Sequence, residues 1–190
     1  MNKIIWPLLL CAVLCGCGGG ETGNAVQEQY RTLETARLEA EVTSHTSTDS
    51  RTFTLLCSYD ADGDAVTTVT DPGELAGLTA VVSGTDMTLR SEGLQLPAGA
   101  SLDICPANCL PYLLRALADG YVLEQSSEAL DDTPCLRLAL DTTAPGGGKV
   151  LCVVWLDAEG LFPRYAEFSR NEQVVLTVKL LAFTCTTSEG

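Results

Sequence analysis

Apolar and polar positions follow two different periods along the chain. Through residues 25–42 the apolar side chains recur at intervals of three and four, which predicts an amphipathic surface helix. Beyond residue 50 apolar and polar side chains alternate, and β-branched and aromatic residues become frequent, as is typical of half-buried strands. The segments predicted as strands are residues 51–60, 64–71, 78–84, 86–93, 121–127, 133–143, 149–158, 162–170 and 172–183.

A second helix is predicted to interrupt the strands at residues 106–120. Asn108 is its candidate N-cap, Pro111 lies in its first turn and Gly120 ends it. Its apolar stripe requires a buried partner surface and consists of Leu110, Leu113, Leu114 and Leu117. Because successive strands joined by short turns pair antiparallel, the pattern predicts an α+β fold in which a large curved antiparallel sheet carries two helices.

An export signal precedes these elements. Lys3 supplies the positive start, and residues 4–14 form an apolar run that is too short to span a bilayer. The run ends in Leu-Cys-Gly-Cys, residues 14–17, which resembles the bacterial lipobox. That resemblance implies that cleavage leaves Cys17 as an acylated N-terminus. The alternative is an ordinary secretory signal with an incidental cysteine.

The lipobox interpretation divides the chain into three parts. Residues 1–16 are a lipoprotein signal peptide, residues 17–24 are the lipidated cysteine with a flexible glycine-rich linker, and residues 25–190 are a single domain. Two or more acyl chains hold a protein stably at a membrane. We therefore expect an extracytoplasmic domain attached to the membrane by its lipid anchor, at the outer face of the cell membrane or, in a two-membrane bacterium, at the outer membrane.

Composition narrows the classes of partner. The chain has 190 residues, 46% of them hydrophobic, which suits one domain and excludes disorder for most of its length. Its 25 Asp and Glu outnumber 11 Lys and Arg, for a net charge of −14. Because this charge repels phosphate groups, neither nucleic acid nor bare anionic lipid is expected as a partner.

The cysteines do not form a known metal or redox motif. None of them forms a Cys-x-x-Cys pair or has a histidine nearby. Buried free thiols are favoured over disulfides, which stay the alternative in an extracytoplasmic compartment. Cys105 and Cys109, four residues apart, are the candidates for an accessible thiol pair. The six cysteines that remain after processing are Cys57, Cys105, Cys109, Cys135, Cys152 and Cys185.

Catalytic motifs are also missing from the sequence. It contains no serine-hydrolase elbow, zinc-protease helix, P-loop or dinucleotide-binding glycine pattern, and His45 is its only histidine. The acidic run at residues 60–64 has its glycine at the wrong position for a calcium loop and favours a hairpin turn. The sequence therefore predicts a protein that is not an enzyme, with no catalytic residue, metal or cofactor.

Residues 153–168, Val-Val-Trp-Leu-Asp-Ala-Glu-Gly-Leu-Phe-Pro-Arg-Tyr-Ala-Glu-Phe, resemble the late hairpin of the LolA/LolB-like superfamily. That superfamily includes bacterial lipoprotein carriers, regulators of envelope stress and clostridial lipoproteins related to the germination protein GerS. The resemblance implies that the sheet is an incomplete β-barrel, apolar inside, with helices packed across its concave side. The sequence pattern alone would assign the following residues to an ordinary hydrophobic core, but the resemblance makes them candidates for lining a cavity: Phe53, Leu55, Leu113, Leu117, Trp155 and Phe168.

The resemblance implies two functions. The first is a membrane-anchored, non-enzymatic accessory protein that binds a protein partner in the envelope, as in GerS-like regulation of germination; an exposed sheet edge, strand exchange or a homodimer would supply the contact. The second is the binding or transfer of lipid or lipoprotein acyl chains, such as palmitate, in the apolar half-barrel. Extracted lipid would support the second, and a captured protein partner the first.

Overall fold

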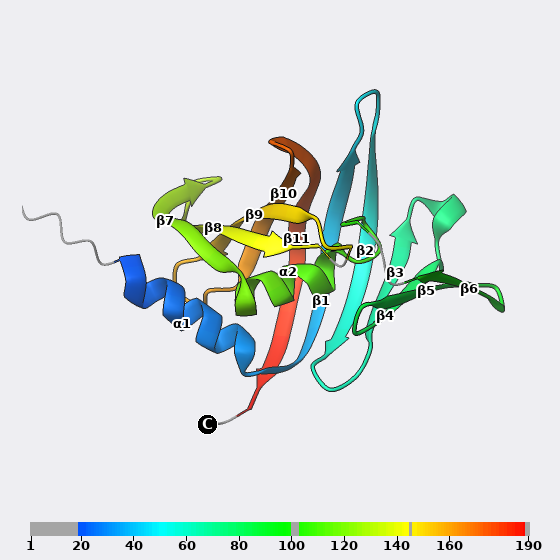
Figure 1. The fold of residues 1–190 in the computed structure, drawn as a ribbon, viewed down its shortest axis with the longest axis horizontal. Coiled ribbons are helices and arrows are strands. Elements are labelled where there is room, and N and C mark those ends of the chain that lie inside the picture. The colour runs from blue at the N-terminus through cyan, green and yellow to red at the C-terminus, as the bar shows by residue number, and fades with distance from the viewer. Residues whose placement is uncertain (1–18, 100–102, 145, 189–190) are drawn as a thin grey trace, which may run out of the picture.

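The computed structural model describes residues 19–99, 103–144 and 146–188, so the predicted signal peptide and Cys17 lie outside the described residues. Two α-helices, a short 3-10 helix and one sheet of 11 strands make up the described part (Figure 1). In chain order they are α1 (Gly19–Arg31), β1 (Leu33–His45), β2 (Ser50–Asp60), β3 (Ala65–Asp71), η1 (Gly73–Leu75), β4 (Thr79–Ser83), β5 (Asp86–Ser91), β6 (Leu94–Gly99), α2 (Cys109–Asp119), β7 (Tyr121–Leu130), β8 (Thr133–Thr143), β9 (Lys149–Asp157), β10 (Pro163–Arg170) and β11 (Gln173–Thr187).

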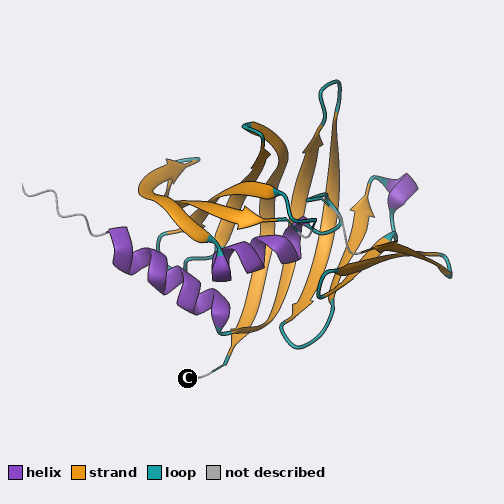
Figure 2. Ribbon diagram, in the orientation of Figure 1, coloured by secondary structure: helices purple, strands orange, loops and turns teal. Residues whose placement is uncertain are grey.

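All neighbouring strands pair antiparallel, in the order β6-β5-β4-β3-β2-β1-β11-β10-β9-β8-β7. The pairing of β1 with β11 joins the first strand to the last, whereas β6 and β7 stay as the two free edges. The curved sheet is therefore an incomplete barrel, and α1 and α2 lie on its concave side (Figure 2). This confirms the predicted α+β fold class.

The helix predicted for residues 25–42 is wrong in its second half. α1 ends at Arg31, and β1 begins at Leu33. The buried residues of β1 alternate with Glu39 and Glu41, a period of two that the interval of three and four obscured. β1 pairs with both β2 and β11, so tertiary pairing overrides a local sequence that also suits a helix.

α1 also begins earlier than expected. The segment predicted as a flexible linker is helical from Gly19 onward. Gly23 lets this part of α1 approach β7 closely, since a Cβ at that position would lie 3.0 Å from Oε1 of Gln125. Only the first residues of the predicted linker therefore lie ahead of α1.

The edge strand β6 is absent from the predicted strands. Its sequence, Leu-Gln-Leu-Pro-Ala-Gly, contains a proline that argues against a central strand, but an edge strand tolerates one. Leu96 pairs with Leu89 of β5. On the other edge, β7 and the strands that follow it lie where the alternation predicts them.

α2 begins at Cys109 and ends before Gly120, close to the prediction. Asn108 stands at the N-cap position, but its side chain does not cap the helix. Instead Asn108 Oδ1 accepts a hydrogen bond from the Cys105 amide at 2.9 Å, and its Nδ2 donates to the Asp103 carbonyl at 3.0 Å. This buried amide therefore organises the turn that leads into α2.

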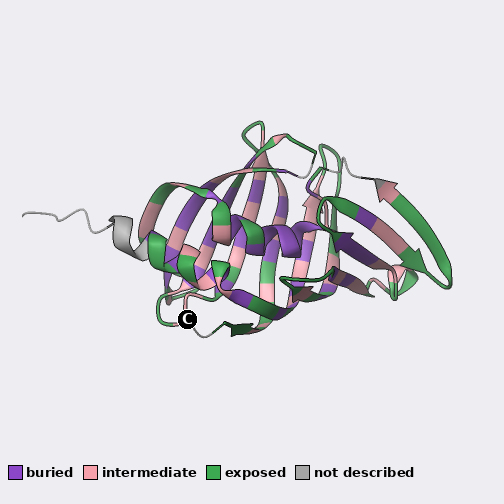
Figure 3. Ribbon diagram, turned by 60° about the horizontal axis from the view of Figure 1, so that its bottom comes forward, coloured by how far each residue is buried: buried purple, intermediate pink, exposed green. Residues whose placement is uncertain are grey.

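The core fills the space between α2 and the curved sheet. α2 is mostly buried, whereas α1 exposes its outward face (Figure 3). The leucines of the predicted stripe, Leu110, Leu113, Leu114 and Leu117, are each at most 2% exposed. A second, smaller cluster lies under β3–β5 and consists of Ala65, Ala80, Val82 and Met87.

Candidate functional site

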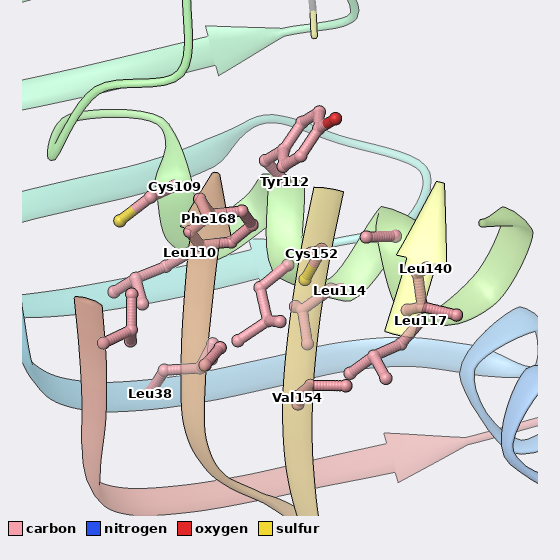
Figure 4. Close-up of a cluster of buried hydrophobic side chains, with 14 of the residues drawn as sticks. Leu38, Cys109, Leu110, Tyr112, Leu114, Leu117, Leu140, Cys152, Val154 and Phe168 are labelled. Atoms are coloured by element: carbon pink, nitrogen blue, oxygen red, sulfur yellow. The ribbon is translucent and has the colours of Figure 1, made fainter. Parts of the chain in front are cut away.

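Four of the six candidate cavity residues meet in the main core. Leu113 and Leu117 from α2, Leu55 from β2 and Phe168 from β10 are each at most 1% exposed. Figure 4 shows the leucine face of α2 against side chains of the sheet. Phe53 is only partly buried and packs at the margin of this cluster. The concave side is thus lined by the predicted residues, but α2 occupies the space.

Trp155 lies on the opposite face of the sheet from the other candidates. Its neighbours Val154 and Leu156 point into the core, so the alternation of β9 places the indole on the convex side. There the Arg137 guanidinium lies 5.6 Å from the indole centroid, and the Tyr165 ring lies 5.5 Å away. Trp155 belongs to an outer-face cluster and does not line the concave side.

Polar contacts fix α2 at both ends. Arg170 of β10 forms an ion pair of 2.7 Å with Asp103, just ahead of the helix. Gln27 of α1 donates a hydrogen bond of 2.6 Å to the carbonyl of Gly120, and Arg115 donates one of 2.9 Å to the carbonyl of Gly84. These contacts and the buried leucine face make α2 part of the core in this structure.

Tyr112 adds a polar contact inside this region. Its ring packs edge-on against Phe168 at 5.7 Å, and its hydroxyl hydrogen-bonds to the Thr142 hydroxyl. Burial is the main cause that raises the pKa of Tyr112, to about 12. The phenol therefore stays protonated near neutral pH.

The six described cysteines are free, which confirms the preference for thiols over disulfides. The predicted accessible pair is wrong, because Cys109 is fully buried while Cys105 is partly exposed. Burial raises the pKa of Cys57 to about 11 and that of Cys109 well above its usual value. Since the thiolate is the nucleophile, these buried thiols are inert at neutral pH.

The acidic run at residues 60–64 forms the hairpin turn that its glycine position predicts. The Asp62 amide donates to Asp60 Oδ1 at 3.0 Å, and the Gly63 amide donates to the Asp60 carbonyl at 3.3 Å. His45 contacts the hydroxyls of Ser50 at 3.0 Å and Thr177 at 3.2 Å. Within residues 19–99, 103–144 and 146–188, no group of three or more His, Cys, Asp or Glu could hold a metal ion.

The two free edges of the sheet differ in their side chains. β7 carries Glu124 and Glu128, which pair with Arg137 at 3.3 and 3.6 Å. β6 has no charged residue, and its Leu94 and Leu96 are 67% and 62% exposed. An uncharged apolar edge strand is a surface that proteins normally cover. We refer to the paired strands β5 and β6 as the β5–β6 wing.

None of the described helices is long and apolar enough to cross a membrane. No protein-family model matches the chain, and no curated protein matches it in sequence.

Solved structures share the fold. A structure from Vibrio parahaemolyticus, described as an outer membrane lipoprotein-sorting protein domain, superimposes with a TM-score of 0.50 at 11% identity, over 90% of this chain and 92% of that chain. A DUF1329 family protein from Desulfovibrio piger gives 0.51 at 13% identity, over 90% and 94%. A chain of the Clostridioides difficile CwlD amidase complex with the GerS lipoprotein gives only 0.36 at 19% identity, over 94% and 96%.

These likenesses concern architecture. The first two confirm the open, incomplete barrel that the late hairpin suggested. At such low identity they show the fold alone, and the third superposition is too loose to carry an argument about function.

Proposed function

We propose that the chain is a membrane-anchored, extracytoplasmic lipoprotein that binds a protein partner in the cell envelope and is not itself an enzyme. The observation that supports a protein partner most directly is the contrast between the part of the concave side that α2 fills and the bare apolar side chains of the edge strand β6. Leu113 and Leu117 leave no exposed leucine face on α2, whereas Leu94 and Leu96 expose more than half of their surface. A partner strand or apolar segment would cover β6 and satisfy its outer backbone groups.

The anchor in this proposal is the Cys17 thioether. The short apolar run and the Leu-Cys-Gly-Cys sequence support it. Labelled palmitate supplied to living cells should enter the wild-type protein and not a Cys17→Ser variant. A Cys15→Ser variant is the matched control and should keep its label. Equal labelling of wild type and Cys17→Ser would contradict acylation at this residue.

The partner surface can be tested by placing a photo-crosslinking amino acid at Leu96 in the full chain. Leu56 is the control position, because it is also well exposed, at 46%, and belongs to the central strand β2. We expect one discrete crosslinked product from position 96 and none from position 56. The product should disappear when Leu94→Asp is introduced. Equal products from both positions would contradict a specific β6 contact.

Binding of a lipid or acyl chain is the second candidate function. Directly paired residues run from buried Cys57 of β2 across β3 and β4 to Leu89 of β5 and Leu96 of β6. Because directly paired residues point to the same face, Leu89 and Leu96 lie on the concave face of the sheet, which favours this function. Neither α1 nor α2 extends over the β5–β6 wing in Figure 1. Lipid extraction of the purified protein separates the two candidates: stoichiometric lipid that a Leu96→Asp variant loses supports the carrier function, and the absence of such lipid with an intact partner crosslink supports the accessory function.

A further inference from the structure

Two β-bulges lie close together on the neighbouring strands β10 and β11, away from the β5–β6 wing. In β10, Pro163 pairs with Leu156 and Tyr165 pairs with Trp155, so Arg164 is an extra residue. In β11, the register with β1 skips Leu181. Tyr165 pairs with Lys179 between these two positions. Bulges redirect side chains and are frequent at functional sites.

Both redirected side chains line one open groove of about 520 Å³, a volume within the range of small-molecule sites. Phe162 and Leu181 form part of its apolar surface and are 39% and 48% exposed. Phe162 is held by Phe183, whose ring centroid lies 5.4 Å away. The apolar side of the groove is therefore both exposed and firmly supported.

The groove also gathers positive charge in a strongly acidic protein. Arg164 and Lys179 line it and are exposed, and neither takes part in an ion pair among the described residues. Asp131 lines the groove as its one carboxylate, and Glu41 of β1 is the register partner of Lys179. Glu41 therefore lies opposite Lys179, whereas Arg164, the extra residue of its bulge, has no register partner on β9 and is the lining cation that an added negative group can pair with.

We propose that this groove binds an anionic amphiphile, a phosphate or carboxylate group joined to an apolar chain. Arg164 and Lys179 contact the anionic group, and Phe162 and Leu181 contact the apolar chain. A guanidinium and an ammonium group attract such an anion by charge-assisted hydrogen bonds. The exposed phenyl and leucyl groups gain from the removal of apolar surface from water. A lipid headgroup in the membrane and a soluble amphiphile share this chemistry.

The chain carries its own control for a footprinting experiment. Lys149 and Lys179 are the only lysines after Lys3, and Lys149 lies on β9 with its side chain 88% exposed. We would place the purified full chain in phosphatidylcholine nanodiscs and measure the acetylation rate of each lysine by mass spectrometry. Three probes would be added separately: dihexanoylphosphatidylglycerol, dihexanoylphosphatidylcholine and inorganic phosphate. A further sample would carry long-chain phosphatidylglycerol in the nanodisc itself.

At four-fifths occupancy, dihexanoylphosphatidylglycerol should slow acetylation of Lys179 about fivefold and leave Lys149 unchanged. Arg164→Gln should weaken this protection, whereas Arg90→Gln, an exposed cation on β5 without a described ion pair, should not. Leu181→Ser should weaken it as well. Protection by long-chain phosphatidylglycerol alone would also support the site and would identify its source as the membrane.

Four results would overturn the proposal. Equal protection of Lys149 and Lys179, or protection of neither lysine by any of the added lipids, would show that the groove is not a site. Equal protection by inorganic phosphate would show an anion site without an apolar part. Equal protection by dihexanoylphosphatidylcholine would show that the negative charge is not recognised. None of these results bears on the β6 contact, so the groove and the proposed partner function fail independently.

Discussion

The substitution Leu113→Ala tests whether α2 fills the half-barrel or covers an open cavity. Leu113 is 0% exposed on the face of α2 that meets the sheet. Truncation removes about 2 kcal/mol of transfer free energy and leaves a cavity, so the free energy of unfolding should fall by about 3 to 5 kcal/mol. That loss is a large fraction of the stability of an ordinary domain, which is about 5 to 15 kcal/mol.

Urea unfolding followed by circular dichroism measures this loss as a shift of the midpoint at constant slope. Leu123→Ala is the matched control, because Leu123 is 55% exposed on β7. Its effect should stay within about 0.5 kcal/mol. A loss below about 1 kcal/mol for Leu113→Ala would refute the reasoning, because the side chain would then lack the close packing that defines a filled core.

Three further predictions follow from the described contacts. Gly120→Ala should cost about 1 to 3 kcal/mol of unfolding free energy in urea, because its Cβ would overlap the Ala116 carbonyl oxygen, whereas Gly148→Ala, with nothing within 4 Å, should be nearly neutral. The free energy of unfolding should fall as pH rises from about 9 to about 11, because Cys57 stays protonated in the folded state after the unfolded thiol has ionised; a Cys57→Ala variant should lose part of this slope, and an unchanged slope would contradict burial of the thiol. With the crosslinking amino acid at position 96, Leu94→Asp should abolish the partner crosslink yet change the free energy of unfolding in urea by no more than about 0.5 kcal/mol, since the Leu94 side chain is exposed; a larger loss would place β6 in the folded core.

The sequence predicted strands well where alternation was continuous. The hairpin of β2 and β3 and the strands from β8 to β11 lie where β-branched residues alternate with polar ones. It failed for β1, because Leu33 and the residues after it suit both a helical and a strand period, and only pairing with β2 and β11 decides between them. Local pattern does not contain that long-range information.

The site residues show the same limit. Phe168 and Leu113 were expected on the concave side from the family resemblance, but nothing local shows that α2 fills that side. Trp155 was misplaced although the alternation of β9 puts Val154 and Leu156 on the other face. The bulge at Leu181 did leave a signal, since two adjacent leucines interrupt the alternation of β11. The charge of the groove appears only when β10 and β11 are paired.

The position of α1 bears on which kind of partner the β6 edge can meet. Gly23 packs near Val122 and Gln125 of β7, so α1 lies against the side of the incomplete barrel whose edge strand is β7. In Figure 1 the start of α1 and the β5–β6 wing lie at opposite ends of the longest axis. If Cys17 carries the anchor, the tether joins the membrane to the α1 end and leaves the wing at the far end of the domain. A bare apolar edge held away from the bilayer is placed for contact with another protein of the envelope, and this favours the accessory function over lipid transfer at β6.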